Sequence, residues 1–432
     1  MTLAFFLCLI TLFVIAAIGA PIAYAIMVSA IVYLVTSGQS MGIAGKVLMD
    51  GLYQSFILLA VPLFIVAANI MNAGTITDRL LKFCVALVGR FRGGLGHVNV
   101  IASLIFSGMS GSAVADAAGI GKIIIDMMTK SGHYSRGYAA AITAASATIG
   151  PIIPPSIPMV LYALVSNTSI GYLFLGGIVP GLLMGVVLMA MNTWLSHRRG
   201  FALEEPVPIR ELPGLTINAV PALLMPAILL YGIYGGVTTP TEAAAVAAAY
   251  ALVLAAVFYR ALSFKTFYSI LVESARSSAA IGLVIGGALI LNYIVASENI
   301  PDRMAQALVG IDVPPLVFVL GVNVLLLLLG CVLDATTIIL VIIPLFIPTC
   351  IHLEIDLVHF GVVAVVNCMI GLITPPYGIL LFVINAVTRI PLGEIIREIW
   401  LFLAVLIVAL LAMILFPEIV LWLPRQFGYK PS

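Results

Sequence analysis

The sequence predicts an all-α polytopic membrane protein, on the strength of three observations. Hydrophobic residues make up 63% of the 432 residues and charged residues only 9%, against about a quarter charged in soluble domains. Apolar runs long enough to span a bilayer recur along the chain, beginning at 3–19 and 22–37. Two proline-rich stretches interrupt such runs, ATIGPIIPPSIPM at 147–159 and CMIGLITPPYGIL at 368–380. Because proline removes a backbone donor and clashes with the preceding turn, each stretch predicts a broken helix within the membrane.

The two proline-rich stretches also indicate an internal repeat. They align without gaps at an offset of 221, so that Gly150 matches Gly371 and the pair Pro154 and Pro155 matches Pro375 and Pro376. Upstream, ITDRL at 76–80 matches IPDRM at 300–304 at an offset of 224. Two matches in the same order predict a duplicated transporter-like repeat.

Each repeat is expected to contain a re-entrant hairpin followed by the broken helix. Glycine, serine or aspartate interrupts the apolar stretches 94–130 and 315–352, which we predict as the two hairpins. The broken helices are predicted at 137–165 and 357–388. The remaining spans are predicted at 3–19, 22–37, 53–74, 171–196, 214–234, 241–259, 266–296 and 396–423.

Charge predicts that the two repeats are inverted in the membrane. With the N-terminus outside, most basic residues fall on the cytoplasmic face, as the positive-inside rule requires. The first DR segment then lies inside and carries Arg79, Lys82, Arg90 and Arg92, whereas the second lies outside and carries only Arg303. Counting the hairpins as single crossings would scatter the basic loops over both faces.

The predicted tip of the first hairpin, SGMSGSAVADAAGIG at 107–121, is rich in small residues. Backbone carbonyls and hydroxyls exposed at membrane depth are tolerated only where they line protein or a cavity. Such oxygens suit a small, hard cation, although close helix packing is the alternative role of small residues. Asp116, four residues after Ser112, and the pair Lys122 and Asp126 are weaker signals.

Asp334 stands alone in the apolar run of the second hairpin and is followed by Thr336 and Thr337. An isolated carboxylate at this depth indicates an ion or substrate path. The alternative is a structural carboxylate that caps backbone amides at the hairpin tip.

Hairpin tips and broken helices together predict one site at the repeat interface. Freed carbonyls attract cations, and the helix N-terminus after each break attracts anions. The predicted sodium ligands are Ser110, Gly111, Ser112, Thr148, Gly150, Asp334, Thr336, Thr337, Gly371 and Thr374. The predicted substrate contacts are Ser107, Pro154, Ser156 and Pro375. No cofactor is expected beyond the coupling ion Na⁺.

The motifs SGMSGSAVADAAGIG, YAAAITAASATIGPIIPPSIPMVLYA and LDATTIILVIIPLFIP resemble the large membrane subunit of tripartite ATP-independent periplasmic (TRAP) transporters. The resemblance covers essentially the whole chain. It implies a sodium-driven importer of organic anions such as dicarboxylates or sialic acid, located in the bacterial inner membrane. It also implies a small four-helix membrane subunit and a periplasmic substrate-binding protein as partners.

The same resemblance implies an elevator mechanism, in which a transport domain moves against a scaffold. The predicted parts are N-terminal scaffold helices at 1–52, the first inverted repeat at 53–196, a cytoplasmic linker with scaffold helices at 197–265, and the second inverted repeat at 266–424.

Other classes of protein fit the sequence less well. A stand-alone sodium/dicarboxylate symporter, needing no binding protein, is the main alternative. A membrane enzyme would need a cluster of His, Cys or carboxylate residues at one membrane face, but the five histidines are dispersed. A channel is disfavoured because no filter motif is present, and the net charge of +1 gives no reason to expect nucleic acid.

Overall fold

The computed structural model describes residues 2–54, 56–72, 75–203, 207–300, 303 and 313–430. The N-terminal part consists of α1 (Leu3–Ala17), α2 (Ile22–Thr36), α3 (Gly42–Gln54), η1 (Phe56–Leu59), α4 (Ala60–Met71) and α5 (Thr75–Val88). The first hairpin and broken helix follow as α6 (Gly94–Ser110), α7 (Ala113–Asp116), η2 (Ala117–Gly121), α8 (Lys122–Lys130), α9 (Arg136–Ala147) and α10 (Ile157–Ser166). Of the second DR segment, Pro301, Asp302 and Met304 lie outside the described residues.

The middle of the chain contains four long helical segments and one short 3₁₀ turn, η3. They are α11 (Ile170–Arg199), η3 (Ile209–Glu211), α12 (Leu212–Tyr234), α13 (Pro240–Val253) continued by η4 (Leu254–Phe258), and α14 (Phe264–Ser297). The second hairpin comprises α16 (Pro315–Gly330), α17 (Ala335–Thr337), η5 (Ile338–Ile342), η6 (Ile343–Leu345) and α18 (Ile347–His352). The chain continues through α19 (Leu357–Gly371), α20 (Ile379–Thr388), α21 (Leu392–Leu415) and α22 (Glu418–Gln426).

The all-helical membrane fold is confirmed by helix length and composition. Within the described ranges, five helices are long and apolar enough to cross a membrane, namely α11, α12, α13 with η4, α14 and α21. The expected spans 3–19 and 22–37 form the shorter apolar helices α1 and α2. Both predicted broken spans are interrupted at their proline-rich stretches, between α9 and α10 and between α19 and α20. Single apolar runs in the sequence therefore correspond to pairs of short helices where proline intervenes.

One expected boundary was wrong, and one helix was not expected. The final span was predicted at 396–423, but α21 already ends at Leu415 and α22 is a separate helix. Phe416 adopts non-helical angles before Pro417, as a residue that precedes proline tends to do. The span predicted at 53–74 is preceded by α3, an additional helix that the count of apolar runs did not reveal.

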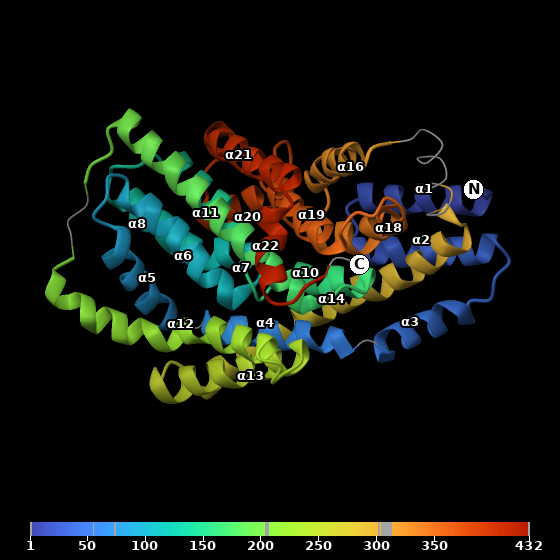
Figure 1. Ribbon diagram of the computed structural model, residues 1–432, viewed down its shortest axis with the longest axis horizontal. Coiled ribbons are helices and arrows are strands. Elements are labelled where there is room, and N and C mark those ends of the chain that lie inside the picture. The colour runs from blue at the N-terminus through green and yellow to red at the C-terminus, as the bar shows by residue number, and fades with distance from the viewer. Residues whose placement is uncertain are drawn as a thin grey trace.

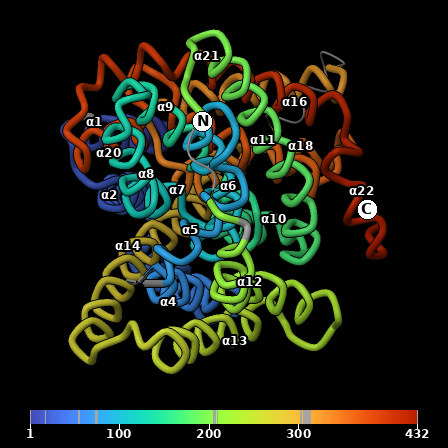
Figure 2. Tube along the Cα trace, turned by 90° about the vertical axis from the view of Figure 1, so that its left-hand side faces the viewer, coloured from blue at the N-terminus to red at the C-terminus, as the bar shows by residue number. Residues whose placement is uncertain are grey.

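The helices form two groups that lie one above the other in both views. Helices α4, α12 and α13 lie along the lower side, and α6, α11, α16 and α21 lie above them (Figures 1 and 2). Helix α13 packs on α4, and α14 packs on α2, α3 and α4. At the far end of α14, the Glu298 carboxylate accepts hydrogen bonds from the Thr2 amide (3.0 Å) and the Tyr33 hydroxyl (3.1 Å). These bonds fasten the first two helices to α14.

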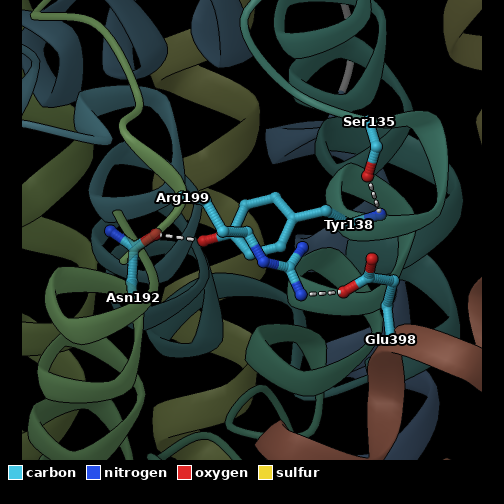
Figure 3. A network of polar contacts seen from close by, with 5 residues as sticks. All are labelled: Ser135, Tyr138, Asn192, Arg199 and Glu398. Carbon is cyan, nitrogen blue, oxygen red and sulfur yellow. Dashed lines mark hydrogen bonds and ion pairs between the residues drawn. The ribbon is translucent and has the colours of Figure 1, made fainter. Parts of the chain in front are cut away.

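A polar and aromatic network fastens one end of the first broken helix to its neighbours (Figure 3). Tyr138 of α9 donates a hydrogen bond to Asn192 of α11, whose side-chain amide donates to the Gly93 carbonyl just before α6. The Arg199 guanidinium lies over the Tyr138 ring and pairs with Glu398 of α21 at 2.7 Å. Four elements therefore meet at this end through one cluster of contacts.

Candidate ion and substrate site

The first hairpin turns at a glycine that the backbone conformation requires. Gly111 ends α6 with φ of 58°, a left-handed conformation that favours glycine. Ser112 then begins α7 and accepts a hydrogen bond from the Ala115 amide. The tip therefore consists of two helix ends that face each other across Gly111 and Ser112.

The first break lies between α9 and α10. A hydroxyl side chain forms a hydrogen bond on each side of the break. Before it, Thr148 donates to the Ala145 carbonyl at 2.6 Å, and after it, Ser156 accepts from the Met159 amide at 3.2 Å. The Ser156 hydroxyl also donates to the Pro151 carbonyl. Thr148 and Ser156 are fully buried. Both have local structural partners, and their predicted ion and substrate roles remain predictions.

The first tip packs directly against the first break. A β-carbon placed on Gly111 would lie 2.4 Å from the Pro155 carbonyl oxygen, and one on Gly150 would lie 3.6 Å from the Ser112 carbonyl oxygen. One turn earlier in α6, a β-carbon on Gly108 would lie 2.5 Å from Pro226 of α12. A side chain at Gly111 would therefore clash with the backbone of the break and one at Gly108 with the Pro226 ring, whereas the distance from Gly150 to Ser112 is an ordinary contact. Of the predicted sodium set, the structure brings Ser112 against Gly150, while Gly111 lies against Pro155.

The second hairpin tip has the same construction with a different cap. Asp334 begins α17 and accepts hydrogen bonds from the Thr337 amide (3.2 Å) and the Thr337 hydroxyl. The structural alternative raised for Asp334, a carboxylate cap at the tip, is thus present. It leaves open a second role, since Asp334 and Thr336 are only half-buried.

The second tip packs against the second break. A β-carbon on Gly371 would lie 2.7 Å from the Gly330 Cα. Beyond the break, the Gly378 amide donates to the Cys331 carbonyl at 3.3 Å. Thr374 at this break donates to the Ile370 carbonyl at 2.8 Å. The second break is more open than the first, because Pro375 is half-buried and Pro376 exposed, whereas Pro154 and Pro155 are buried.

In each repeat, the helix that follows the break packs against the hairpin of the other repeat. Helix α10, which follows the first break, packs against α17 and η5 of the second hairpin. Helix α20, which follows the second break, packs against α7, η2 and α8 of the first hairpin. A π-helical turn follows each tip, η2 in one repeat and η5 in the other, and such turns are frequent at functional sites. The two tips and two breaks therefore belong to one interlocked unit.

A repeated hydrogen bond joins each hairpin to its own broken helix. In the first repeat, Ser146 of α9 donates to the Asn99 side chain of α6 at 2.9 Å. In the second, Asn367 of α19 donates to the Asn323 side chain of α16 at 2.7 Å. Asn99 and Asn323 are separated by the same 224 residues as the DR segments, and Ser146 and Asn367 by the same 221 residues as the prolines. These pairs were not predicted from the sequence, although they follow from the two offsets.

Asp116, one of the weaker signals in the sequence, is an unusual charged group in this unit. It is buried, and neither of its carboxylate oxygens has a hydrogen-bond partner. The Ser103 hydroxyl lies close to it but donates to Ser146 at 3.1 Å. A buried carboxylate without a partner is costly at membrane depth and needs a proton or a cation. Its isolation in an apolar stretch was the available signal.

The substrate residues predicted from the sequence lie in the same unit. Ser107 is buried on α6 and donates to the Leu104 carbonyl, and the Pro154 carbonyl lies near Gly108 on the same helix. Pro375 lies at the other break. Contacts in the structure therefore join Ser107 and Pro154 through α6, while the substrate role of all four predicted residues stays a prediction.

These features define a class, a polytopic membrane transporter whose paired hairpins and broken helices form one core. The chain belongs to the tripartite ATP-independent periplasmic transporter family, DctM component, whose family model matches residues 9–419.

Curated relatives agree with this membership. The chain is 40% identical to the sialic acid TRAP transporter large permease protein SiaM of Vibrio cholerae serotype O1, over 95% of this chain and 96% of that protein. It is 38% identical to the C4-dicarboxylate TRAP transporter large permease protein DctM of Pseudomonas aeruginosa, over 87% of this chain and 88% of that protein. Because these relatives are transporter permease proteins, the chain is a transporter component and not an enzyme.

A solved structure supports the fold. The YdaH transporter of Alcanivorax borkumensis superposes with a TM-score of 0.60 at 15% sequence identity, covering 90% of this chain and 88% of that one. At this identity the likeness concerns architecture alone.

Proposed function

We propose that this chain is the large permease subunit of a sodium-coupled importer of a small organic acid in a bacterial inner membrane. The observation that carries the proposal is the duplicated packing of a hairpin tip on a proline-broken helix, Gly111 on Pro155 and Gly371 on Gly330. The names of the relatives, which specify sialic acid and C4-dicarboxylates, support a carboxylate substrate of this class.

Two groups of oxygen ligands are proposed for sodium. The first consists of Ser110, Gly111, Ser112, Thr148 and Gly150, and the second of Asp334, Thr336, Thr337, Gly371 and Thr374. Proline-broken backbone leaves carbonyl oxygens without helical partners, and carbonyl, hydroxyl and carboxylate oxygens suit a hard cation. The left-handed turn at Gly111 and the half-buried Asp334 at the other tip support this choice of residues.

The substrate carboxylate is proposed to lie between the two ion sites. Ser156 precedes the N-terminus of α10, and the positive end of the helix dipole there attracts an anion. Ser107, Pro154 and Pro375 are the other proposed contacts. Two cations beside the carboxylate would offset its charge, so that binding of ion and substrate would be coupled.

The interlocked hairpins and broken helices are proposed to move as the transport domain against a scaffold. The contact between Gly108 and Pro226 of α12 is one place where the two would slide. A small four-helix membrane subunit would cover part of the scaffold, and a periplasmic binding protein would deliver the substrate. The family is tripartite, which favours these partners over a stand-alone symporter.

The test is reconstitution in proteoliposomes with an inward sodium gradient. Uptake of labelled sialic acid and of a C4-dicarboxylate would be measured for this chain alone, with the small subunit, and with both partners. We expect uptake only with both partners, and its loss when the sodium gradient is replaced by potassium. Full-rate uptake by the chain alone would contradict the tripartite mode, and uptake that ignores sodium would contradict the coupling.

A further inference from the structure

A cavity of about 520 Å³ lies between the end of α5, the start of α6 and the last turns of α11, apart from the tip-and-break site. Its polar lining consists of Arg92, His97, Thr193 and His197, and its apolar lining of Val88, Phe91, Met189 and Ala190. We propose that this cavity binds the headgroup of an anionic phospholipid, with an acyl chain continuing along α11. The proposal is independent of sodium coupling.

The polar end of the cavity suits a phosphate. Arg92 is exposed and permanently charged, and the described residues that line the cavity include no acid. His197 donates a hydrogen bond from Nδ1 to the Thr193 carbonyl at 2.8 Å, which fixes the orientation of its ring in the lining of the cavity. Arg90 and Arg198 flank the site. The guanidinium carbon of Arg90 lies 5.4 Å from the centroid of the Phe91 ring, and that of Arg198 lies 5.1 Å from the centroid of the Trp194 ring.

The acyl chain has a groove of its own next to the cavity. A second hollow of about 420 Å³ lies between α11 and α21 and shares Ala190 with the first. All its lining residues are apolar: Val187, Ala190, Met191, Trp194, Leu401, Val405 and Val408. A basic cavity that continues into a wholly apolar groove matches the order of groups in a phospholipid.

The position of Trp194 places this junction at the depth of lipid headgroups. Tryptophan is enriched where the membrane meets water, and Trp194 is half exposed with the Arg198 guanidinium over its ring. Further back along α11, Leu182 and Val186 are exposed as a lipid-facing stripe would be. Basic pockets between membrane helices on the cytoplasmic side are known to select anionic headgroups. A bound lipid would therefore contact both α11 and, through His97, α6 of the first hairpin.

The experiment uses Trp194 as the reporter. The full chain has three tryptophans, and Trp400→Phe with Trp422→Phe leaves Trp194 alone. This protein is reconstituted in phosphatidylcholine vesicles with graded brominated phosphatidylglycerol, and in phosphatidylglycerol vesicles with graded brominated phosphatidylcholine. We expect Trp194 quenching to show about a fivefold preference for phosphatidylglycerol over phosphatidylcholine. One basic residue near the membrane surface is expected to contribute a preference of about this size.

Matched variants separate a built site from general surface charge. Arg92→Gln with His197→Gln should reduce the preference to about one, while quenching by pure brominated phosphatidylcholine stays unchanged and shows that the variant is inserted and folded. Arg210→Gln with Lys265→Gln removes two basic residues elsewhere and should keep the preference. Equal quenching by both lipids, an equal loss in the control variant, or displacement by excess inorganic phosphate would each overturn the proposal.

Discussion

Asp334 has two roles to distinguish, a helix cap and an ion ligand, and one substitution separates them. Asparagine caps a helix about as well as aspartate, so Asp334→Asn keeps the bond to the Thr337 amide and removes the charge. If Asp334 binds sodium, the substitution should weaken sodium binding by about 1–3 kcal/mol. The sodium concentration for half-maximal uptake should then rise about 5- to 150-fold. Sodium titration of uptake in proteoliposomes measures it.

Asp356 provides the control for that substitution. It caps α19 by accepting from the Val358 and His359 amides, both at 2.9 Å, and was not predicted as an ion ligand. Asp356→Asn should leave the sodium dependence as in the unaltered protein. An unchanged sodium titration for Asp334→Asn would leave that residue with its capping role alone.

Substitution of Asp116 should reduce uptake without lowering thermal stability, whereas substitution of a structural residue should lower thermal stability. Because its buried oxygens have no hydrogen-bond partner, removing the charge relieves a desolvation cost. Asp116→Asn should therefore leave the thermal unfolding midpoint unchanged or raised while uptake falls at least about tenfold, the effect of about 1.4 kcal/mol. A thermal shift assay and an uptake assay on one preparation test both halves. A lowered midpoint with normal uptake would contradict a functional role.

At the scale of the elements, hairpin bounds and breaks followed from the sequence because glycine, serine and proline act locally. The predicted hairpins 94–130 and 315–352 coincide with the ends of α6, α8, α16 and α18. Contacts between elements were harder to anticipate. The Asn99 and Asn323 pairs needed the repeat offsets to be followed through every position, and the missing partners of Asp116 depend on how α6 and α9 pack.

The contact of α16 with α19 offers a test on a single helix. A β-carbon on Gly330 would lie 3.0 Å from the Gly371 Cα, which is backbone and cannot move aside, whereas one on Gly321 of the same helix meets nothing within 4 Å. Gly330→Ala should therefore force the second tip away from its break and reduce sodium-dependent uptake severalfold. Overpacking of this kind costs about 1–3 kcal/mol.

Gly321→Ala is the matched control, since the same substitution in open space should leave uptake unchanged or slightly improve helix stability. Normal uptake by both variants would show that the close approach at Gly330 is dispensable.

At the scale of the whole molecule, the packing of each repeat against the hairpin of the other is the main structural support for an inverted repeat. Helix α10 packs on the second hairpin and α20 on the first, as expected of two halves related by a two-fold axis. Two copies inserted in the same orientation would place both DR segments on one face. The charges predict opposite faces, with four basic residues near Asp78 and one near Asp302.

The orientation of the two DR segments therefore tests the inverted-repeat site most directly. Single cysteines would replace Asp78 or Asp302 in a protein whose five native cysteines, all buried, have been removed. Right-side-out vesicles would then be treated with a membrane-impermeant thiol reagent. We expect labelling at position 302, and none at position 78 until the vesicles are opened. Equal labelling of both positions in intact vesicles would contradict it.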